Sequence, residues 1–179
     1  MSADRPRHEI ATRRVTYEVA TDGVTVNHNI PYELGRNDGL ALDIYYPART
    51  PHEPAAPALL FVTGYPDDGL QRVLGCVAKD MESYVSWARL AAANGIVAIT
   101  YQNRTPEDVH AVLRYMKDHA GALGIDARRI GVWSCSGNLP TAHHLPAGPR
   151  AGGGTWWITA WIRTSSTIRT SAETTSRTP

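Results

Sequence analysis

The sequence is poor in cysteine, in net charge and in long apolar runs, and each shortage excludes a class of protein. Its 179 residues contain two cysteines, Cys76 and Cys135, too few for a secreted scaffold stapled by disulfides. The formal net charge of +1 gives no electrostatic reason to expect a nucleic-acid or membrane partner. The N-terminal residues lack the apolar core of a signal peptide, and apolar runs such as residues 58–63 are too short to span a bilayer. We therefore expect a cytoplasmic protein.

Motifs that bind cofactors are also missing. No CxxC pair and no Cys/His cluster at zinc spacing is present, so the sequence implies no metal. No G-x-G-x-x-G and no P-loop follows an expected strand, which argues against a nucleotide-binding domain. We expect neither a metal nor an organic cofactor. The oligomeric state is not set by any of these features.

What the sequence does contain is an alternation of strands and helices. Apolar runs typical of strands buried on both faces occur at residues 58–62, 96–101 and 129–133. Between them, the residue patterns predict one helix over 85–93 and another from about 105 to 121. Buried strands joined by helices indicate a parallel sheet with crossover helices, and the length fits one domain.

An antiparallel edge is expected on the N-terminal side of this sheet. Residues 14–20 are rich in β-branched and aromatic side chains, Asp22-Gly23 marks a turn, and residues 24–26 resume the alternation, which predicts a hairpin. A further alternating strand covers residues 40–46. The expected fold is therefore α/β, a mostly parallel sheet with an N-terminal antiparallel hairpin and flanking helices.

The C-terminal segment has a different composition. Residues 155–179 contain twelve Ser or Thr, one acidic residue and neither strand alternation nor a helical stripe. We interpret residues 146–179 as a low-complexity tail that is disordered or non-native. Two origins remain open: out-of-frame translation after a genuine start, or a natural disordered tail. The other reading frames of the coding DNA distinguish them.

Residues 130–140, IGVWSCSGNLP, carry the candidate chemistry. They follow a buried strand and precede an expected helix, which is the setting of a nucleophile elbow. With Ser136 as the nucleophile, the small residues that such a tight turn needs fall on Ser134 and Asn138. The turn would lift the hydroxyl clear of the sheet and direct the Gly137 N–H at a developing oxyanion. The alternative is an ordinary polar loop between a strand and a helix.

Cys135 is a rival nucleophile, because a thiol is intrinsically more reactive than a hydroxyl. That register would place Trp133 two residues before the nucleophile, where a bulky ring does not fit the turn. We therefore prefer Ser136.

The second half of an oxyanion hole is expected in the loop after an earlier buried strand. That loop begins Thr63-Gly64-Tyr65-Pro66, directly after the run at residues 58–62. Gly64 permits a close backbone approach, and the Tyr65 N–H is the expected donor. A generic strand-ending turn is the alternative, since Gly and Pro favour turns in any case.

Together these segments resemble the α/β-hydrolase superfamily, most closely its dienelactone-hydrolase-like and esterase-like branches. The resemblance rests on LALDIYYP at 40–47, PALLFVTGYPD at 57–67, WARLAAANGIVAITY at 87–101 and RIGVWSCSGN at 129–138. It implies an incomplete α/β-hydrolase domain over residues 14–145 and a serine acyl hydrolase with a small-molecule ester or acyl substrate. Dienelactone hydrolases carry cysteine where this sequence has Ser136, so their particular substrate is not implied.

The remainder of a catalytic triad is not found after the elbow. In this superfamily the acid and then the histidine follow the nucleophile. The residues after Ser136 include no Asp, one Glu (Glu173) and two histidines, His143 and His144. At a helical rise of about 1.5 Å per residue these histidines would lie roughly 10 Å from the hydroxyl, too far for a base. We expect little activity from this chain; the alternative is a noncatalytic α/β fragment or binding module with a vestigial elbow.

Overall fold

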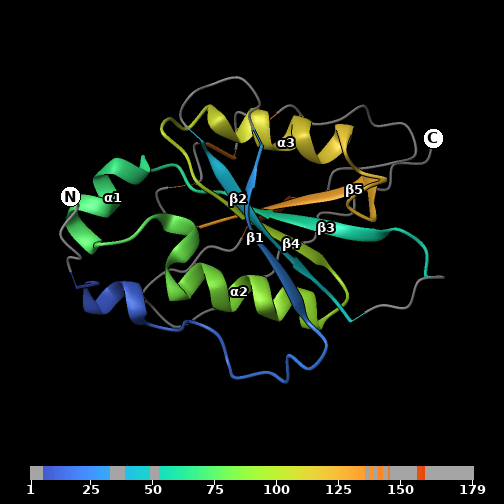
Figure 1. The fold of residues 1–179 in the computed structure, drawn as a ribbon, viewed down its shortest axis with the longest axis horizontal. Coiled ribbons are helices and arrows are strands. Elements are labelled where there is room, and N and C mark those ends of the chain that lie inside the picture. Colours follow the sequence, from blue (N-terminus) through green and yellow to red (C-terminus); the bar gives the residue numbers. More distant parts are fainter. Residues whose placement is uncertain are drawn as a thin grey trace, which may run out of the picture.

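The structure is a computed structural model that describes residues 6–32, 39–48, 53–135, 138, 141–142, 145 and 157–159. Its centre is a six-stranded mixed sheet with the order β1-β2-β4-β3-β5-β6 (Figure 1). The strands are β1 (Thr25–Pro31), β2 (Ala41–Tyr46), β3 (Ala56–Phe61), β4 (Val97–Tyr101), β5 (Ile125–Ser134) and β6 (Trp157–Thr159). The β1–β2 and β2–β4 pairs are antiparallel, and the other three pairs are parallel.

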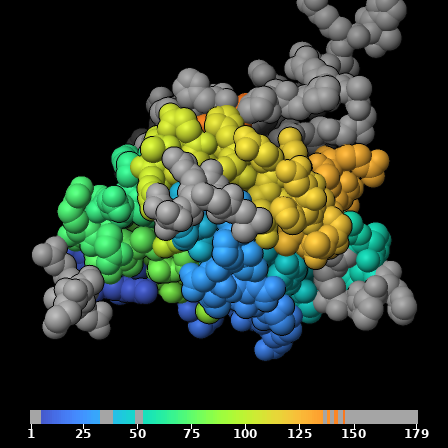
Figure 2. All heavy atoms as spheres, turned by 45° about the horizontal axis from the view of Figure 1, so that its top comes forward, coloured from blue at the N-terminus to red at the C-terminus, as the bar shows by residue number. Residues whose placement is uncertain are grey.

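Helices cover both faces of the sheet, with α3 on one face and α2 on the other (Figure 1). The helical segments are η1 (Glu9–Thr12), α1 (Asp67–Leu74), η2 (Ala78–Asp80), α2 (Glu82–Ala93) and α3 (Asp108–Asp118). Figure 2 shows the face covered by α3 (yellow), which lies between the α1 region (green) and residues of β5 (orange). Side chains alternate between two cores because neighbouring residues of a strand point to opposite faces. Leu60 and Val62 pack in the core beneath α3, whereas Phe61 packs beneath α2.

The chain leaves the adjacent strands β3 and β5 towards opposite faces of the sheet. After β3 it passes to the α2 side, where Leu70 and Tyr84 join the core. After β5 it passes to the α3 side, where Ala142 and Leu145 are buried in the other core. Such a divergence opens a crevice beyond the carboxyl ends of the two strands, the usual binding place in open α/β sheets. The fold therefore predicts a site between the segments that follow β3 and β5.

A buried ion pair fixes η2 to the sheet. Lys79 and Asp43 are 4% and 3% exposed in their side chains, and Lys79 Nζ lies 3.1 Å from Asp43 Oδ1. Asp43 also accepts a hydrogen bond from the Asn29 N–H, at a bulge in β1 where Asn29 has φ of 55°. Lys79 is held in addition by Asp80 at 2.9 Å. The charges are thus paired, as burial requires.

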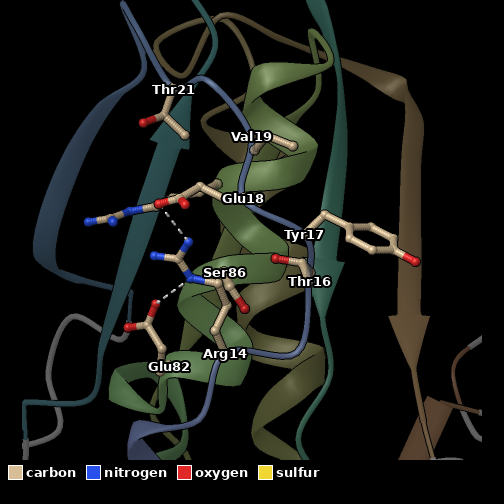
Figure 3. A pocket seen from close by; sticks show the side chains of 9 residues that line it. Arg14, Thr16, Tyr17, Glu18, Val19, Thr21, Glu82 and Ser86 are labelled. Carbon is tan, nitrogen blue, oxygen red and sulfur yellow. Dashed lines mark hydrogen bonds and ion pairs between the residues drawn. The ribbon is translucent and has the colours of Figure 1, made fainter.

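The expected N-terminal hairpin exists, but it is built from other strands. Residues 14–20, predicted as its first strand, form no strand; β1 begins at Thr25 and pairs with β2 instead. Figure 3 shows the 14–21 segment running along α2, where Arg14 lies 3.7 Å from Glu82. Val15 and Tyr17 are 52% and 93% exposed. These β-branched and aromatic side chains led to the strand prediction, but they do not belong to a strand of the sheet.

The strands predicted from apolar runs and alternation are confirmed, with small shifts at their ends, and so are the helices at 85–93 and 105–121. Sequence reasoning missed α1, and β6 lies inside the segment interpreted as a low-complexity tail, parallel to β5. Apart from β6, residues 146–179 lie outside the described residues. Among the helices in the described part of the chain, none is long and apolar enough to cross a membrane.

Candidate active site at the ends of β3 and β5

The loop after β3 and the turn after β5 touch each other. The Gly64 N–H donates a hydrogen bond to Asn138 Oδ1 at 2.8 Å. A Cβ on Gly64 would lie 2.7 Å from Thr141 Oγ1 and 3.3 Å from Asn138 Cα, so no larger residue fits without displacement. The segment that comes close to Gly64 is therefore the one that follows Ser136 in the chain, and the role of Gly64 in an oxyanion hole stays a prediction.

Asn138 is buried at 6% exposure and both ends of its amide have partners. While Oδ1 accepts from Gly64, Nδ2 donates to the Tyr84 hydroxyl at 2.9 Å. Burial raises the pKa of Tyr84 far above the ordinary value of a phenol, and the Cys135 thiol adds to the rise. The hydroxyl therefore stays protonated, and it faces the Val62 carbonyl at 3.5 Å. Tyr84 thus connects α2 to both loops.

The other side of the loop after β3 is held by the last residue of β4, by Asn103 just after it and by η2. The Thr63 carbonyl accepts hydrogen bonds from the Tyr101 hydroxyl at 3.1 Å and from Asn103 Nδ2 at 3.2 Å. The buried Asp67 carboxylate accepts from the backbone N–H of Asn103 and of Ala78, each at 2.8 Å. Burial raises the pKa of Asp67, although these two bonds oppose the rise. The loop is fixed before any ligand arrives, as an oxyanion site requires.

The residues around the predicted elbow are described in part. Ser134, its last strand residue, is 2% exposed, and its hydroxyl has no hydrogen-bond partner among the described residues. The Asn138 N–H donates to the Cys135 carbonyl at 3.1 Å, so the residues on either side of Ser136 and Gly137 are held together. Ser136 and Gly137 themselves lie outside the described residues. Their assignment as nucleophile and oxyanion donor stays a prediction.

The rival nucleophile Cys135 sits in an unfavourable place. Its side chain is half-buried, and burial raises the pKa of the thiol, which lowers the thiolate fraction that would react. Trp133, which would occupy the small position of that register, packs instead between Phe61 and Trp87, with ring centroids 5.3 and 3.9 Å away. Both observations favour Ser136 over Cys135.

The two residues predicted for the oxyanion hole in the loop after β3 differ in the partners of their backbone N–H groups. The Gly64 N–H donates to Asn138 Oδ1, and the role of Gly64 in an oxyanion hole stays a prediction. The Tyr65 N–H makes no hydrogen bond to any described residue, and Tyr65 is 54% exposed. The assignment of the Tyr65 N–H as an oxyanion donor stays a prediction.

Neither His28 nor His119 is placed to act as a base at the end of β5. His28 lies on β1, four strand spacings or about 19 Å across the sheet from β5. Its ring contacts Asp43 at 2.9 Å, and its side chain is 60% exposed. His119 follows α3 and contacts the Tyr115 carbonyl. His143 and His144 lie outside the described residues. Nor does any trio of His, Cys, Asp or Glu able to hold a metal occur in the described part.

Sequence reasoning missed the three side chains that support the site, Tyr84, Asn103 and Asp67. Tyr84 and Asn103 stand in α2 and after β4, and no local motif marks either of them. Asn138 was noticed only as a residue that tolerates tight turns. The pairing of an amide with a glycine N–H that is 74 residues away in the chain is not visible in a sequence pattern.

The mixed sheet, its helices on both faces and the divergence after β3 and β5 are those of the α/β-hydrolase fold. No protein-family model matches the chain, and no curated protein matches it. Solved structures do match it, and they are hydrolases with this fold. The expected fold class is confirmed.

Three solved structures illustrate the likeness. Native esterase 2 of the Planctomycetes species Thermogutta terrifontis is 20% identical with a TM-score of 0.51, covering 81% of this chain and 51% of that chain. Esterase B of Lactobacillus rhamnosis is 19% identical with a TM-score of 0.51, covering 70% and 40%. The α/β hydrolase MGS-M1 from a Medee basin deep-sea metagenome library is 22% identical with a TM-score of 0.50, covering 72% and 53%. The chain spans about half the length of these enzymes or less.

Proposed function

We propose that this chain carries the nucleophile half of a serine acyl hydrolase, with Ser136 as the nucleophile. The observation that supports this most directly is the hydrogen bond between Gly64 and Asn138, which brings the loop after β3 against the turn that contains Ser136. A nucleophile elbow needs this neighbour, because the loop supplies the second oxyanion donor. We assign the two donors to the backbone N–H groups of Tyr65 and Gly137.

The proposed reaction is acyl transfer through Ser136. The hydroxyl oxygen attacks the acyl carbon, its proton passes to a base, and the carbonyl oxygen becomes an oxyanion that both N–H groups stabilise. Collapse expels the alcohol and leaves an acyl–Ser136 ester, which water then hydrolyses. We propose that a base from solution can accept this proton in place of a histidine of the chain, and that turnover without such a base is slow.

We propose a short-chain ester as the substrate. Two of the structural neighbours point to such acyl groups: the Thermogutta esterase has been captured with propionate, and the Lactobacillus esterase with a tributyrin phosphonate inhibitor. Ester hydrolysis by a serine nucleophile needs neither a metal nor an organic cofactor, so none is included in the proposal.

The test supplies the missing base as imidazole. The chain is incubated with p-nitrophenyl propionate at rising imidazole concentration, and acylation is followed by mass spectrometry of the peptide that contains Ser136. We expect one propionyl group on Ser136 in the wild type and in the matched control Cys135→Ala, and none at this site in Ser136→Ala. If the folded wild type gains no acyl group there, the chain is a noncatalytic α/β module. An adduct that Cys135→Ala abolishes would move the assignment to the thiol.

A further inference from the structure

The site contains a polar bridge that the acyl-transfer chemistry does not use directly. Asn138 accepts from the Gly64 N–H and donates to the Tyr84 hydroxyl, at 2.8 and 2.9 Å. Asn138 and Tyr84 are buried, at 6% and 8% exposure. A buried amide whose two ends are both satisfied fixes the groups it joins, because breaking either bond leaves a desolvated polar atom.

We propose that Asn138 is a positioning residue that locks the loop carrying the Tyr65 N–H to the turn carrying Ser136, with Tyr84 setting the direction of its amide. This inference rests on the proposed function. The Gly64 N–H is a donor, so only the oxygen of the amide can face it. The nitrogen then needs an acceptor on the opposite side, and the Tyr84 hydroxyl is that acceptor. One orientation of the amide satisfies both neighbours.

The effect on chemistry follows from the position of Gly64 in the chain. Gly64 directly precedes Tyr65, so holding the nitrogen of Gly64 limits the displacement of the next N–H along the backbone. The same loop is held from the other side at Thr63, by Tyr101 and Asn103. Oxyanion donors contribute only when they stand about 3 Å from the developing charge, and a small displacement loses most of their effect.

The first test measures directly how firmly Asn138 holds the Gly64 N–H, and it does not depend on enzymatic activity. Hydrogen exchange of the Gly64 N–H is followed by NMR in a uniformly ¹⁵N-labelled chain. We expect Asn138→Ala to accelerate exchange at Gly64 at least tenfold more than at core amides, and Tyr84→Phe to give a smaller acceleration of the same kind. Tyr32→Phe is the matched control, since it also removes a buried phenol bond, to the Gln102 carbonyl at 2.6 Å. It should leave exchange at Gly64 at the level of the core amides.

The second test separates positioning from a role in folding alone. Imidazole-assisted acylation of Ser136 is measured as a maximal rate constant and a half-saturating ester concentration. Asn138→Ala should lower the rate constant at least tenfold and leave the half-saturating concentration unchanged. A residue needed only for folding would lower the amount of reactive protein, with the rate constant intact.

The outcomes are distinguishable from those of the proposed function. The proposed role of Asn138 is overturned, whatever the activity is, by either of two results. The exchange rate of the Gly64 N–H is unchanged in folded Asn138→Ala, or Tyr32→Phe accelerates it equally. A wild type that protects Gly64 yet never acquires an acyl group overturns the proposed function instead. Accelerated exchange with an unaltered acylation rate constant shows a purely structural role and overturns the positioning role.

Discussion

Gly64 is a residue at which the loop after β3 contacts the turn after β5. Its missing side chain leaves room for Thr141 and for the backbone of Asn138. The sequence predicted a close approach at this glycine, because Gly after a buried strand is typical of the loop that faces a nucleophile. It did not predict what approaches, since Asn138 and Thr141 stand more than seventy residues later in the chain.

Substitution of Gly64 by Ala should push the two loops apart. A new Cβ would lie 2.7 Å from Thr141 Oγ1, and overpacking of this kind costs about 1–3 kcal/mol. We expect a lower free energy of unfolding in urea and a faster exchange of the Gly64 N–H. The double variant Gly64→Ala/Thr141→Ala should recover part of the loss only, because the backbone of Asn138 would still lie 3.3 Å from the new methyl group. Full recovery, or a neutral single variant, would contradict this geometry.

At the scale of elements, the Asp43–Lys79 pair joins β2 to η2 and, through the Asn29 N–H, to the bulge of β1. Burial alone raises the pKa of Asp43. The Asn29 N–H, the His28 ring and the Lys79 ammonium outweigh burial, so the pKa of this carboxyl lies below its usual value. For Lys79 burial acts in the opposite direction and lowers the pKa of the ammonium group. The carboxylates of Asp80 and Asp43 outweigh burial and hold this pKa above its usual value. Both shifts favour the charged pair.

The pair makes stability depend on pH in the acid range. A carboxyl whose folded-state pKa is depressed contributes stability above its unfolded pKa of about 3.9, and this stability is lost as pH falls through the folded-state value. The free energy of unfolding should therefore decline below about pH 4 in the wild type, and less steeply in Asp43→Asn. Urea unfolding at a series of pH values measures this. An identical decline in both proteins would mean that Asp43 is not held in the charged form.

Removing one partner of the pair should cost more than removing both. Asp43→Asn or Lys79→Met leaves a buried charge with fewer partners, a change worth about 3–5 kcal/mol where no other partner compensates. Asp80 still faces Lys79, so we expect the smaller end of this range for Asp43→Asn. The double variant Asp43→Asn/Lys79→Met should lose less than the sum of the single losses. Additive losses in a double-mutant cycle would show that the two side chains act independently.

The sequence predicted strands correctly where several consecutive residues are apolar and buried. Apolar runs marked β3, β4 and the second half of β5, since parallel strands buried on both faces need nothing else. The prediction failed for residues 14–20, whose strand-like composition is exposed on α2, because composition does not reveal whether a partner strand is available. It missed α1, which opens with Asp67-Asp68-Gly69, a sequence more typical of a turn.

At the scale of the whole molecule, the sheet ends at β1 on one side and at β6 on the other within the described residues. β6 covers Val132, Trp133 and Ser134 of β5, just before the elbow. We propose that the domain core is formed by strands β1 to β6 and the helices packed on them, and that the Ser/Thr-rich residues after β6 do not contribute to its stability.

Two deletions test this division. Removing residues 160–179 should leave the melting temperature unchanged, because the low-complexity composition there gives no core to bury. Removing residues 146–179 also removes β6, leaves the β5 edge unpaired and should raise light scattering on heating. A lower melting temperature in the shorter deletion would show that the final residues belong to the fold.

The most direct test of the central claim is a crystal structure of the chain after reaction with a butyl phosphonate ester in the presence of imidazole. We expect phosphorus bonded to Ser136 Oγ, and a phosphonyl oxygen about 3 Å from the Tyr65 and Gly137 nitrogens, the geometry of an oxyanion hole. A phosphonate on another residue, or one on Ser136 whose oxygens face solvent away from Tyr65, would contradict the account.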